Sequence, residues 1–586
     1  MAMTHYKYIG ETRGELANFR TLVRNRVTHK TFAVEADVNR VARQCGTFST
    51  LEEHAERLAP TTSQQYSHSE HLEILHNAAD LGLLISYDVY KEQLRAGLCD
   101  TGTAPAIDKI AIPTRNRTEA LQRLLRQLTD HLEVHQRYAG ILVVDDSEDS
   151  AICGENRRIV AQAVRQGAHI QYEDRMSRTD FAKKLAALSG VPYDLVHFAL
   201  LGEPQLPVTI GSARNTALLQ TAGHKLLFMD DDVECVLIAP EDIHSGIEFG
   251  AENTDISFYS DSTKLSGLTG TGESLLDLHD RALELHAIGR SDNEIRTSKT
   301  PVSLLRRIRN GNGRVLAGLM GIAGDSGYDD PFSYYLQNSE TWRRFTESET
   351  IYRAALENRL ILRTSAGFCV SDRSTCQSHC ISLRNDGLLP PFLPSLRGED
   401  LVFGTLLLAC IPGSLVGIIP RAIKHTPLTP RTYAPESAIN RIGNITAGEA
   451  AAFLIGSIQL RGTEADELFT CVGDGLMQLS RMQSTEFRAQ IFTAAEPMLY
   501  AWYQQLHARS EDRLYRNSSG RRDAINLRDK LERLLQTKDI CTPCDLSSSF
   551  GSEKSLSILQ ENLGRLGQLL RVWPLLWQAA EHLSAG

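Results

Sequence analysis

The sequence predicts an α/β protein with a parallel sheet in its central domain and mainly helical regions on either side. Between residue 109 and about residue 235, short apolar strand patterns alternate with amphipathic helix patterns, which is typical of a parallel sheet covered on both faces. Clusters of polar residues directly follow three of the strands, where ligands bind in such sheets. Before and after this stretch, leucines recur at spacings of three and four, the period of a helix face.

Three domains are expected, because 586 residues are too many for one hydrophobic core. Residues 1–104 are predicted to be mainly helical, and residues 105–435 to form the α/β domain. Residues 436–586 are predicted to form a second helical domain. Its helix faces carry these leucines: Leu527, Leu531, Leu534, Leu535, Leu556, Leu559, Leu563, Leu566 and Leu570. Pro574 is expected to kink or end the last helix.

Strands and helices of the α/β domain follow from the apolar patterns. The expected strands are 110–113, 140–144, 169–172, 195–201 and 226–229, and the expected helices begin near Thr118, Asn156, Asp180 and Gly211. A glycine-rich run at 318–327 has too many glycines for a helix interior. It is interpreted as a mobile loop near the acceptor or as a flexible connector.

Composition excludes several classes of protein. The formal net charge of −10 argues against a general nucleic-acid binder. The first residues lack the apolar segment of a signal peptide, and eleven scattered cysteines suit a reducing cytoplasm. Residues 401–419 carry no charge, but Pro412 and Gly413 divide them into a helix and a strand, so no transmembrane segment is expected. Peripheral contact with a membrane stays open.

The most informative motif is three consecutive aspartates, Asp230, Asp231 and Asp232, after the strand 226–229. Adjacent carboxylates repel one another, and a hard divalent cation such as Mg²⁺ or Mn²⁺ would compensate. In an extended conformation Asp230 and Asp232 point to the same side and can share one metal ion. Such a metal would absorb the charge of a diphosphate leaving group. The plain alternative is a solvated acidic turn.

Three motifs in order resemble the GT-A glycosyltransferases, particularly the large inverting family 2. The first is Pro-Thr-Arg-Asn-Arg at 113–117, the second is Val-Asp-Asp-Ser at 144–147, and the third is the Ala-Arg-Asn helix at 213–215 leading to the aspartates. Ser147 replaces the glycine usual in that family. The resemblance covers residues 107–235 well, and residues to about 430 more loosely. It implies a nucleotide-diphospho-sugar transferase fold, which is Rossmann-like.

The resemblance also implies roles for individual residues on the donor side. Thr114 and Arg117 would lie beside the nucleotide, and Asp145 or Asp146 would accept hydrogen bonds from its base. The remaining roles concern three residues: Arg214 would contact base or phosphate, Asp230 with Asp231 would face the sugar or ribose, and Asp232 would bind the metal.

The second half of the domain is expected to supply the acceptor side. Glu399 and Asp400 precede an apolar helix, as does the Glu-Asp motif of family 2, in which a carboxylate removes the proton of the acceptor hydroxyl. Asp400 is the preferred base and Glu399 the second choice, although carboxylates also stabilise a helix N-terminus. His425 follows the strand 416–419 and is a candidate third metal ligand, although a structural role is the more frequent one for a lone histidine.

The predicted function is the transfer of a sugar from a UDP-, GDP- or dTDP-linked donor to an acceptor hydroxyl, assisted by Mn²⁺ or Mg²⁺. The resemblance to family 2 favours inversion, and retention is the alternative, because some related GT-A families have similar donor-side motifs. A sugar-1-phosphate nucleotidyltransferase and a non-catalytic sugar-nucleotide sensor are the alternatives. The sequence does not identify the acceptor. A zinc site is a weaker expectation, because the spacing of its four residues matches no common zinc finger. These residues are Cys369, Cys376, His379 and Cys380.

Overall fold

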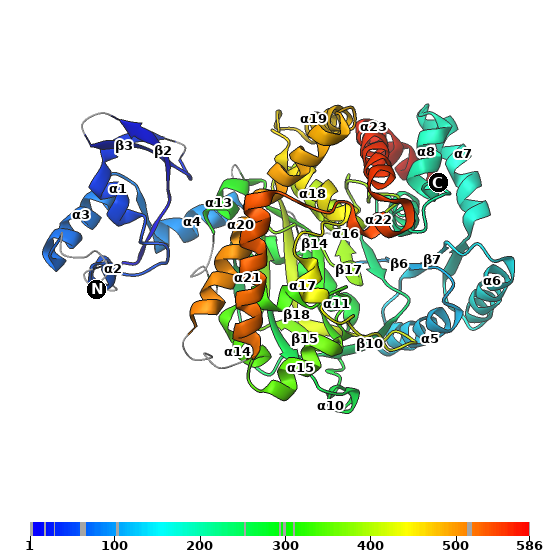
Figure 1. Ribbon diagram of the computed structural model, residues 1–586. Coiled ribbons are helices and arrows are strands. Elements are labelled where there is room, and N and C mark those ends of the chain that lie inside the picture. Colours follow the sequence, from blue (N-terminus) through cyan, green and yellow to red (C-terminus); the bar gives the residue numbers. More distant parts are fainter. Residues whose placement is uncertain are drawn as a thin grey trace.

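The architecture comes from a computed structural model (Figure 1). It describes residues 4–16, 19–28, 30–58, 66–100, 105–250, 254–291, 295–296, 301–308, 311–374, 376–512 and 519–584.

Four parallel strands form the first half of the central sheet, as the sequence predicts. They are β6 (Lys109–Thr114), β7 (Gly140–Asp145), β8 (Ile170–Glu173) and β9 (Leu226–Met229). Their order across the sheet is β9-β6-β7-β8. The chain therefore runs outward from β6 to β8 and then returns to the other side of β6. The carboxyl ends of β6 and β9 flank this reversal, which is where ligands bind in open α/β sheets.

Helices cover both faces of these strands. One layer contains α5 (Thr118–Val134) and α6 (Ser150–Arg165), and the other contains α7 (Arg175–Ser189), α8 (Tyr193–Leu201) and α9 (Ile210–Gln220). Side chains alternate between the layers, since Ile110 and Ile112 join the α5 core whereas Ala111 joins the opposite one. The strand predicted at 195–201 is wrong, because these residues form α8. That helix is apolar almost all round and buried, and periodicity cannot distinguish such a segment from a strand.

Beyond β9 the sheet is mixed rather than parallel. Its full order is β13-β11-β16-β18-β14-β17-β9-β6-β7-β8, with β10 paired to β18 and β15 joining β12 to β14. The added strands are β10 (Val233–Ile238), β11 (Ile247–Phe249), β12 (Thr254–Phe258), β13 (Ile295–Arg296), β14 (Arg314–Asp325), β15 (Leu360–Ser365), β16 (Phe368–Ser371), β17 (Cys380–Leu383) and β18 (Ser414–His425). The helical segments here are α10 (Ser262–Ser266), α11 (Leu275–Leu283), α12 (Leu285–Ser291), α13 (Val302–Arg307), η2 (Phe332–Leu336), α14 (Ser339–Phe345), α15 (Glu349–Glu357) and α16 (Glu399–Cys410).

The glycine-rich run is not a loop over most of its length, because residues 318–325 belong to the central strand β14. Neighbouring strands approach these glycines too closely for any side chain. A Cβ on Gly321 would lie 2.1 Å from the main-chain oxygen of Arg363, and one on Gly318 would lie 2.4 Å from the Ser382 hydroxyl. Glycine inside a strand often marks such a close approach.

The N-terminal region contains strands as well as the predicted helices. It contains the strands β1 (Tyr6–Tyr8), β2 (Gly10–Leu16), β3 (Arg20–Asn25), β4 (Thr31–Glu35) and β5 (Leu84–Ser86), and the helices α1 (Ala36–Ala42), α2 (Leu51–Leu58), α3 (His68–Asp80) and α4 (Tyr87–Gly97). Strand β2 is exposed along nearly its whole length, so its sequence carries no apolar alternation. Buried side chains between Val23 and Leu84 share a separate core, whereas Ile9 joins the core on the α5 face. In Figure 1 this module stands apart from the main body, with α4 between them.

Helix α4 lies before the domain boundary predicted at residue 104, yet it packs into the main body. Its side chains Tyr90 and Leu94 belong to the core on the α5 face of the sheet. Gly97 allows close contact, since a Cβ there would lie 2.6 Å from the main-chain oxygen of Ile308.

The C-terminal region is helical, as predicted. Its helices are α17 (Ser437–Arg441), α18 (Ala447–Ser457), α19 (Ala465–Leu479), α20 (Ser484–Glu511), α21 (Ser519–Thr537), α22 (Cys544–Phe550) and α23 (Ser552–Ser584). Helix α23 continues through Pro574. It packs against α7, α8 and α9 (Figure 1), so this region shares a hydrophobic core with the sheet domain. In the described residues, no helix is long and apolar enough to cross a membrane.

Candidate functional site

The carboxyl ends of β6 and β9 meet through side chains. Thr114 is the last residue of β6, and its hydroxyl donates to Asp231 Oδ2 over 2.8 Å. Arg117, just beyond the strand, donates to Asp231 Oδ1 over 2.9 Å and to Asp232 Oδ2 over 3.0 Å. Burial and the neighbouring Asp232 raise the pKa of Asp231 to about 6, despite the opposing charge of Arg117. The first and third sequence motifs therefore lie together.

The three aspartates form a turn rather than the end of a strand. Strand β9 ends at Met229, and the Val233 amide donates to the Asp230 carbonyl over 3.3 Å. Alternation of side chains holds only in an extended chain, so the argument that alternation brings Asp230 and Asp232 to one metal ion does not apply to this turn. The Asp230 carboxylate instead accepts from Arg214 over 2.7 Å.

Asp232 has a different partner, His425. His425 is the last residue of β18 and pairs with Val233 of β10, which brings its Nε2 to 3.1 Å from Asp232 Oδ1. Its Nδ1 is 2.7 Å from the Asp325 main-chain oxygen. Burial lowers the pKa of His425, but the Asp232 carboxylate outweighs it and raises the pKa overall. Burial opposes ionisation of Asp232, yet His425 and nearby arginines hold the pKa of this carboxyl well below its usual range.

This pair fits a divalent cation that takes its remaining ligands from a bound diphosphate. A carboxylate oxygen and an imidazole nitrogen suit Mn²⁺, and Mg²⁺ sites commonly use one or two protein carboxylates together with substrate phosphates. The contact from Nδ1 of His425 to the Asp325 carbonyl fixes the ring, as second-shell contacts do at metal sites. Among the residues described, no group of three or more His, Cys, Asp or Glu side chains is placed to hold a metal ion by itself.

Two arginines flank the Asp232–His425 pair. The Arg117 side chain is 50% exposed although it contacts Asp231 and Asp232. Arg431 is 35% exposed, lies 3.6 Å from Asp232 Oδ2 and contacts Asp325 Oδ2 at 3.1 Å. Guanidinium groups held this way can bind phosphate oxygens through two parallel hydrogen bonds. Arg431 follows His425 by six residues without a recognisable motif, so the local sequence gives no signal for it.

Asp145 and Asp146 are fully engaged inside the protein. Asp145 accepts from Asn156 over 2.7 Å and from the Tyr172 hydroxyl over 2.6 Å. Asp146 accepts from Arg175 and Arg178, each over 2.6 Å. Both aspartates are buried, so neither is free to accept a hydrogen bond from a nucleotide base. They anchor α6 and α7 to the strand ends.

Arg214 links the donor-side motif to the acceptor-side motif. It is buried, and its Nε lies 3.5 Å from Glu399 Oε1 while another nitrogen contacts Asp230. Its guanidinium carbon is 5.3 Å from the centre of the Phe228 ring and 5.8 Å from that of Phe392. Two aromatic faces and two carboxylates therefore hold this cation in place.

Glu399 and Asp400 open helix α16, as predicted. Gly398 precedes them with φ +82°, and a Cβ on Gly211 of α9 would lie 1.8 Å from the Leu393 main-chain oxygen. Close packing thus fixes the start of α16 against α9. Burial and the neighbouring Asp400 raise the pKa of Glu399 to about 7, and burial also raises the pKa of Asp400, although Arg214 lowers both. A carboxylate that titrates near neutrality is suited to general-base catalysis.

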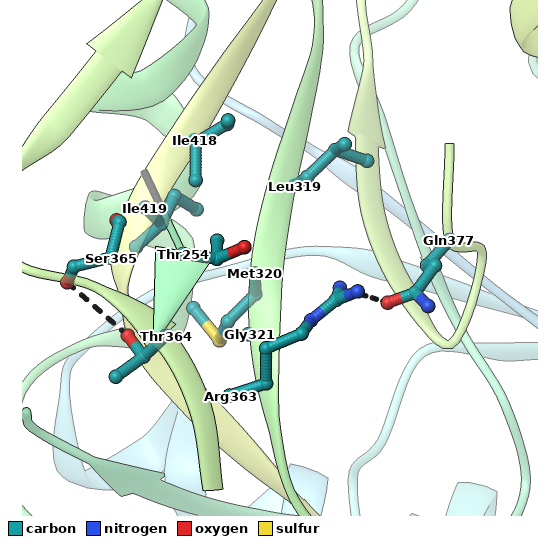
Figure 2. Close-up of a pocket in the computed structure, with 10 residues that line it drawn as sticks. All are labelled: Thr254, Leu319, Met320, Gly321, Arg363, Thr364, Ser365, Gln377, Ile418 and Ile419. Carbon is teal, nitrogen blue, oxygen red and sulfur yellow. Dashed lines mark hydrogen bonds between the residues drawn. The ribbon is translucent and has the colours of Figure 1, made fainter. Parts of the chain in front are cut away.

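Two pockets lie away from the strand ends. Figure 2 shows one beside β14, where Arg363 donates a hydrogen bond to Gln377. Its volume of about 10 Å³ holds at most one water molecule. A groove of about 1040 Å³ lies between Ser457 and Gln490 in the C-terminal helices. Neither of these two pockets contains a predicted site residue.

The four residues of the expected zinc site do not gather around a common point. Cys380 Sγ contacts His279 Nε2 at 3.4 Å, and His379 Nε2 contacts the Gly321 carbonyl at 3.2 Å. Within the part of the chain that is described, these four residues form no group that could hold a metal ion.

Comparisons with known proteins give little further guidance. No protein-family model matches the chain, and no curated protein does. Among solved structures, a mannosyltransferase from Pyrobaculum calidifontis in complex with GDP-mannose and Mn²⁺ aligns with 86% of this chain and 98% of its own, at 10% identity and a TM-score of 0.25. A TM-score of this size does not establish a common fold.

Proposed function

We propose that the protein is a glycosyltransferase of the GT-A type that moves a sugar from a nucleotide-diphosphate donor to an acceptor hydroxyl with the help of Mn²⁺ or Mg²⁺. The observation that carries the proposal is the Asp232–His425 pair at the edge of the sheet where ligands bind. The half-exposed Arg117 and Arg431 lie directly beside this pair.

On the donor side, these residues provide the contacts that a nucleoside diphosphate requires. Asp232 and His425 would hold the cation, and the cation would neutralise the charge that develops on the departing diphosphate. Arg117 and Arg431 would donate hydrogen bonds to the phosphate oxygens. Asp230, oriented by Arg214, is available to accept hydrogen bonds from a sugar hydroxyl or from the ribose.

On the acceptor side, Asp400 would take the proton of the attacking hydroxyl. It is partly exposed, whereas Glu399 is buried against Arg214, so Glu399 is better placed to set the charge of the site. A base on this side favours direct displacement with inversion. An NMR assignment of the product anomer tests this part, because a product with retained configuration would remove the base role from Asp400.

The first experiment incubates the full chain with UDP-, GDP- and dTDP-sugars in Mn²⁺ or EDTA, and measures the released nucleoside diphosphate. We expect release from one donor, dependent on metal and lost in Asp232→Ala. Glu155→Ala is the control, because Glu155 pairs with Arg158 on an exposed helix face away from the site. Donor release that persists in EDTA or in Asp232→Ala would contradict the proposed site. Absence of both donor cleavage and donor binding would contradict the function.

A further inference from the structure

The residues proposed as metal ligands already have cationic partners. Arg431 Nη2 lies 3.5 Å from His425 Nε2 and 3.6 Å from Asp232 Oδ2. Arg117 Nη1 donates to the same Asp232 oxygen over 3.0 Å. Like charges repel strongly at such distances in a partly buried site. A divalent cation and the Arg431 guanidinium therefore cannot both occupy the space in front of Asp232 and His425.

The charges around this pair are balanced by side chains alone. Three carboxylates contact three guanidinium groups: Asp231, Asp232 and Asp325 with Arg117, Arg359 and Arg431. A divalent cation would add an uncompensated charge beside carboxylates that are buried, and uncompensated charge is costly there. The negative charge of a nucleoside diphosphate would restore the balance. The site therefore suits the cation and the diphosphate together better than the cation alone.

Asp325 holds Arg431 near the root of its guanidinium group. Its Oδ2 accepts from Arg431 Nε over 3.1 Å, and its Oδ1 contacts the buried Arg359 at 3.1 Å. The main chain beside Arg431 is held as well, since Thr432 pairs with Asn358 in an isolated bridge. The Arg431 side chain is nevertheless 35% exposed. Its terminal nitrogens can therefore turn from the metal ligands to a bound ligand without movement of the main chain.

We propose that Arg431 competes with the divalent cation for Asp232 and His425, and that a bound diphosphate relieves this competition by drawing the guanidinium onto its own oxygens. The inference rests on the proposed function, which supplies the diphosphate. Guanidinium binds phosphate through two parallel hydrogen bonds, whereas its 3.6 Å contact with Asp232 is longer than a hydrogen bond. The species that the site recognises is therefore the complex of metal and diphosphate, rather than either one alone.

Replacing Arg431 by alanine should change two affinities in opposite directions. Mn²⁺ alone should bind at least about fivefold more tightly, because one positive charge no longer faces its ligands. A nucleoside diphosphate alone should bind at least about tenfold more weakly, because it loses a charged hydrogen-bond donor. A residue that only supported the fold would weaken both affinities when removed, so the opposite signs identify the competition.

Electron paramagnetic resonance of free Mn²⁺ measures the metal affinity of the full chain without nucleotide. Arg431→Lys keeps the positive charge, so its Mn²⁺ affinity should stay within about twofold of the native value. Arg344→Ala is the matched control, because Arg344 is 30% exposed and pairs with Glu340 on its own helix; its Mn²⁺ affinity should not change. Equal or weaker Mn²⁺ binding in Arg431→Ala, or an equal gain in Arg431→Lys, would overturn the proposal.

Isothermal titration calorimetry with UDP, GDP and dTDP in EDTA measures the nucleotide affinity of the same variants. The Mn²⁺ titrations are then repeated with each nucleotide at a saturating concentration, and the Mn²⁺ held by free nucleotide is subtracted. The gain in Mn²⁺ affinity that nucleotide causes should be at least about fivefold smaller in Arg431→Ala than in the native chain. An equal gain in both chains would show that nucleotide does not displace Arg431, which would overturn the proposal.

These binding measurements are separate from catalysis. The expected differences in Mn²⁺ and nucleotide binding, without donor cleavage, would contradict the proposed function and leave the competition standing. Metal-dependent donor cleavage, with the same Mn²⁺ affinity in the native chain and Arg431→Ala, would overturn the competition alone. Failure of Mn²⁺ to bind any of these chains, with or without nucleotide, would overturn both.

Discussion

Replacing Arg214 by methionine should shift the pH dependence of turnover upward. Methionine keeps the apolar contact with the two phenyl rings that enclose the guanidinium, but it removes the charge beside Glu399 and Asp400. That charge lowers the pKa of both carboxyls, while burial raises them and leaves the pKa of Glu399 at about 7. Without the arginine, burial acts alone and ionisation of the pair moves to higher pH.

The size of the shift follows from the contact. A neighbouring arginine lowers a carboxyl pKa by about 1–3 units, so its removal should raise the pH of half-maximal turnover by about the same amount. A base must be ionised to act, so the ionised fraction of Asp400 at pH 7 would fall by at most about tenfold for each unit by which its pKa rises. Turnover at pH 7 should fall by the same factor.

Donor cleavage measured from pH 5.5 to 9.5 checks this prediction. Recovery of turnover at high pH distinguishes a shifted base from a misfolded protein. Arg384→Met is the matched control, because Arg384 is equally buried and contacts Glu284 at 2.9 Å. Arg384 follows β17 and lies near the start of β9, at the opposite end of the strands from the candidate site. The pH profile of Arg384→Met should therefore match that of the native chain. An unshifted profile in Arg214→Met, or loss of turnover at every pH with the fold intact, would refute the reasoning.

Three further predictions concern the donor side and the packing around it. Arg431→Ala should raise the KM for the donor about tenfold or more with less effect on kcat, because it removes a phosphate contact; an unchanged KM in steady-state kinetics would exclude that role. Asp230→Asn should leave Mn²⁺ affinity, measured by electron paramagnetic resonance in the presence of nucleoside diphosphate, within about twofold of the native value, whereas Asp232→Asn should weaken it at least about tenfold. Gly211→Ala should lower the free energy of unfolding by more than about 3 kcal/mol, since its Cβ has no room. Gly154→Ala is the control and should raise the free energy of unfolding by about 0.5–1 kcal/mol. Chemical denaturation measures both, and an unchanged stability of Gly211→Ala would contradict the close packing.

The parts of the fold predicted well were those in which one residue pattern admits one structure. The leucines of α5 and α23 recur at the helical period with polar residues between them. Strands β6 and β7 are short apolar runs that precede and follow α5. Prediction failed where complete burial or complete exposure removed the contrast between apolar and polar positions along an element. Helix α8 is apolar on all sides, β2 is polar on nearly all sides, and the glycines of β14 lie in a strand because neighbouring backbones approach them.

The sequence indicated which residues form the candidate site better than it indicated how they are arranged. The motifs placed Thr114 and Arg117 near the aspartates, and the structure brings them into contact. Local sequence could not show that 230–232 form a turn, nor that Asp145 and Asp146 are enclosed by partners from later helices. The pairing of Asp232 with His425 joins residues 193 positions apart, so only the sheet topology could bring them together.

The contact of α23 with α7, α8 and α9 has a consequence for biosynthesis. The helical layer behind β6, β7 and β9 lacks its outer cover until residues 552–584 have left the ribosome. The N-terminal module, whose core closes within the first 84 residues, can fold early in translation. The catalytic body must instead wait, with part of its apolar surface uncovered, for the last helix to arrive. A nascent chain halted before α23 is therefore the form of this protein most dependent on chaperones.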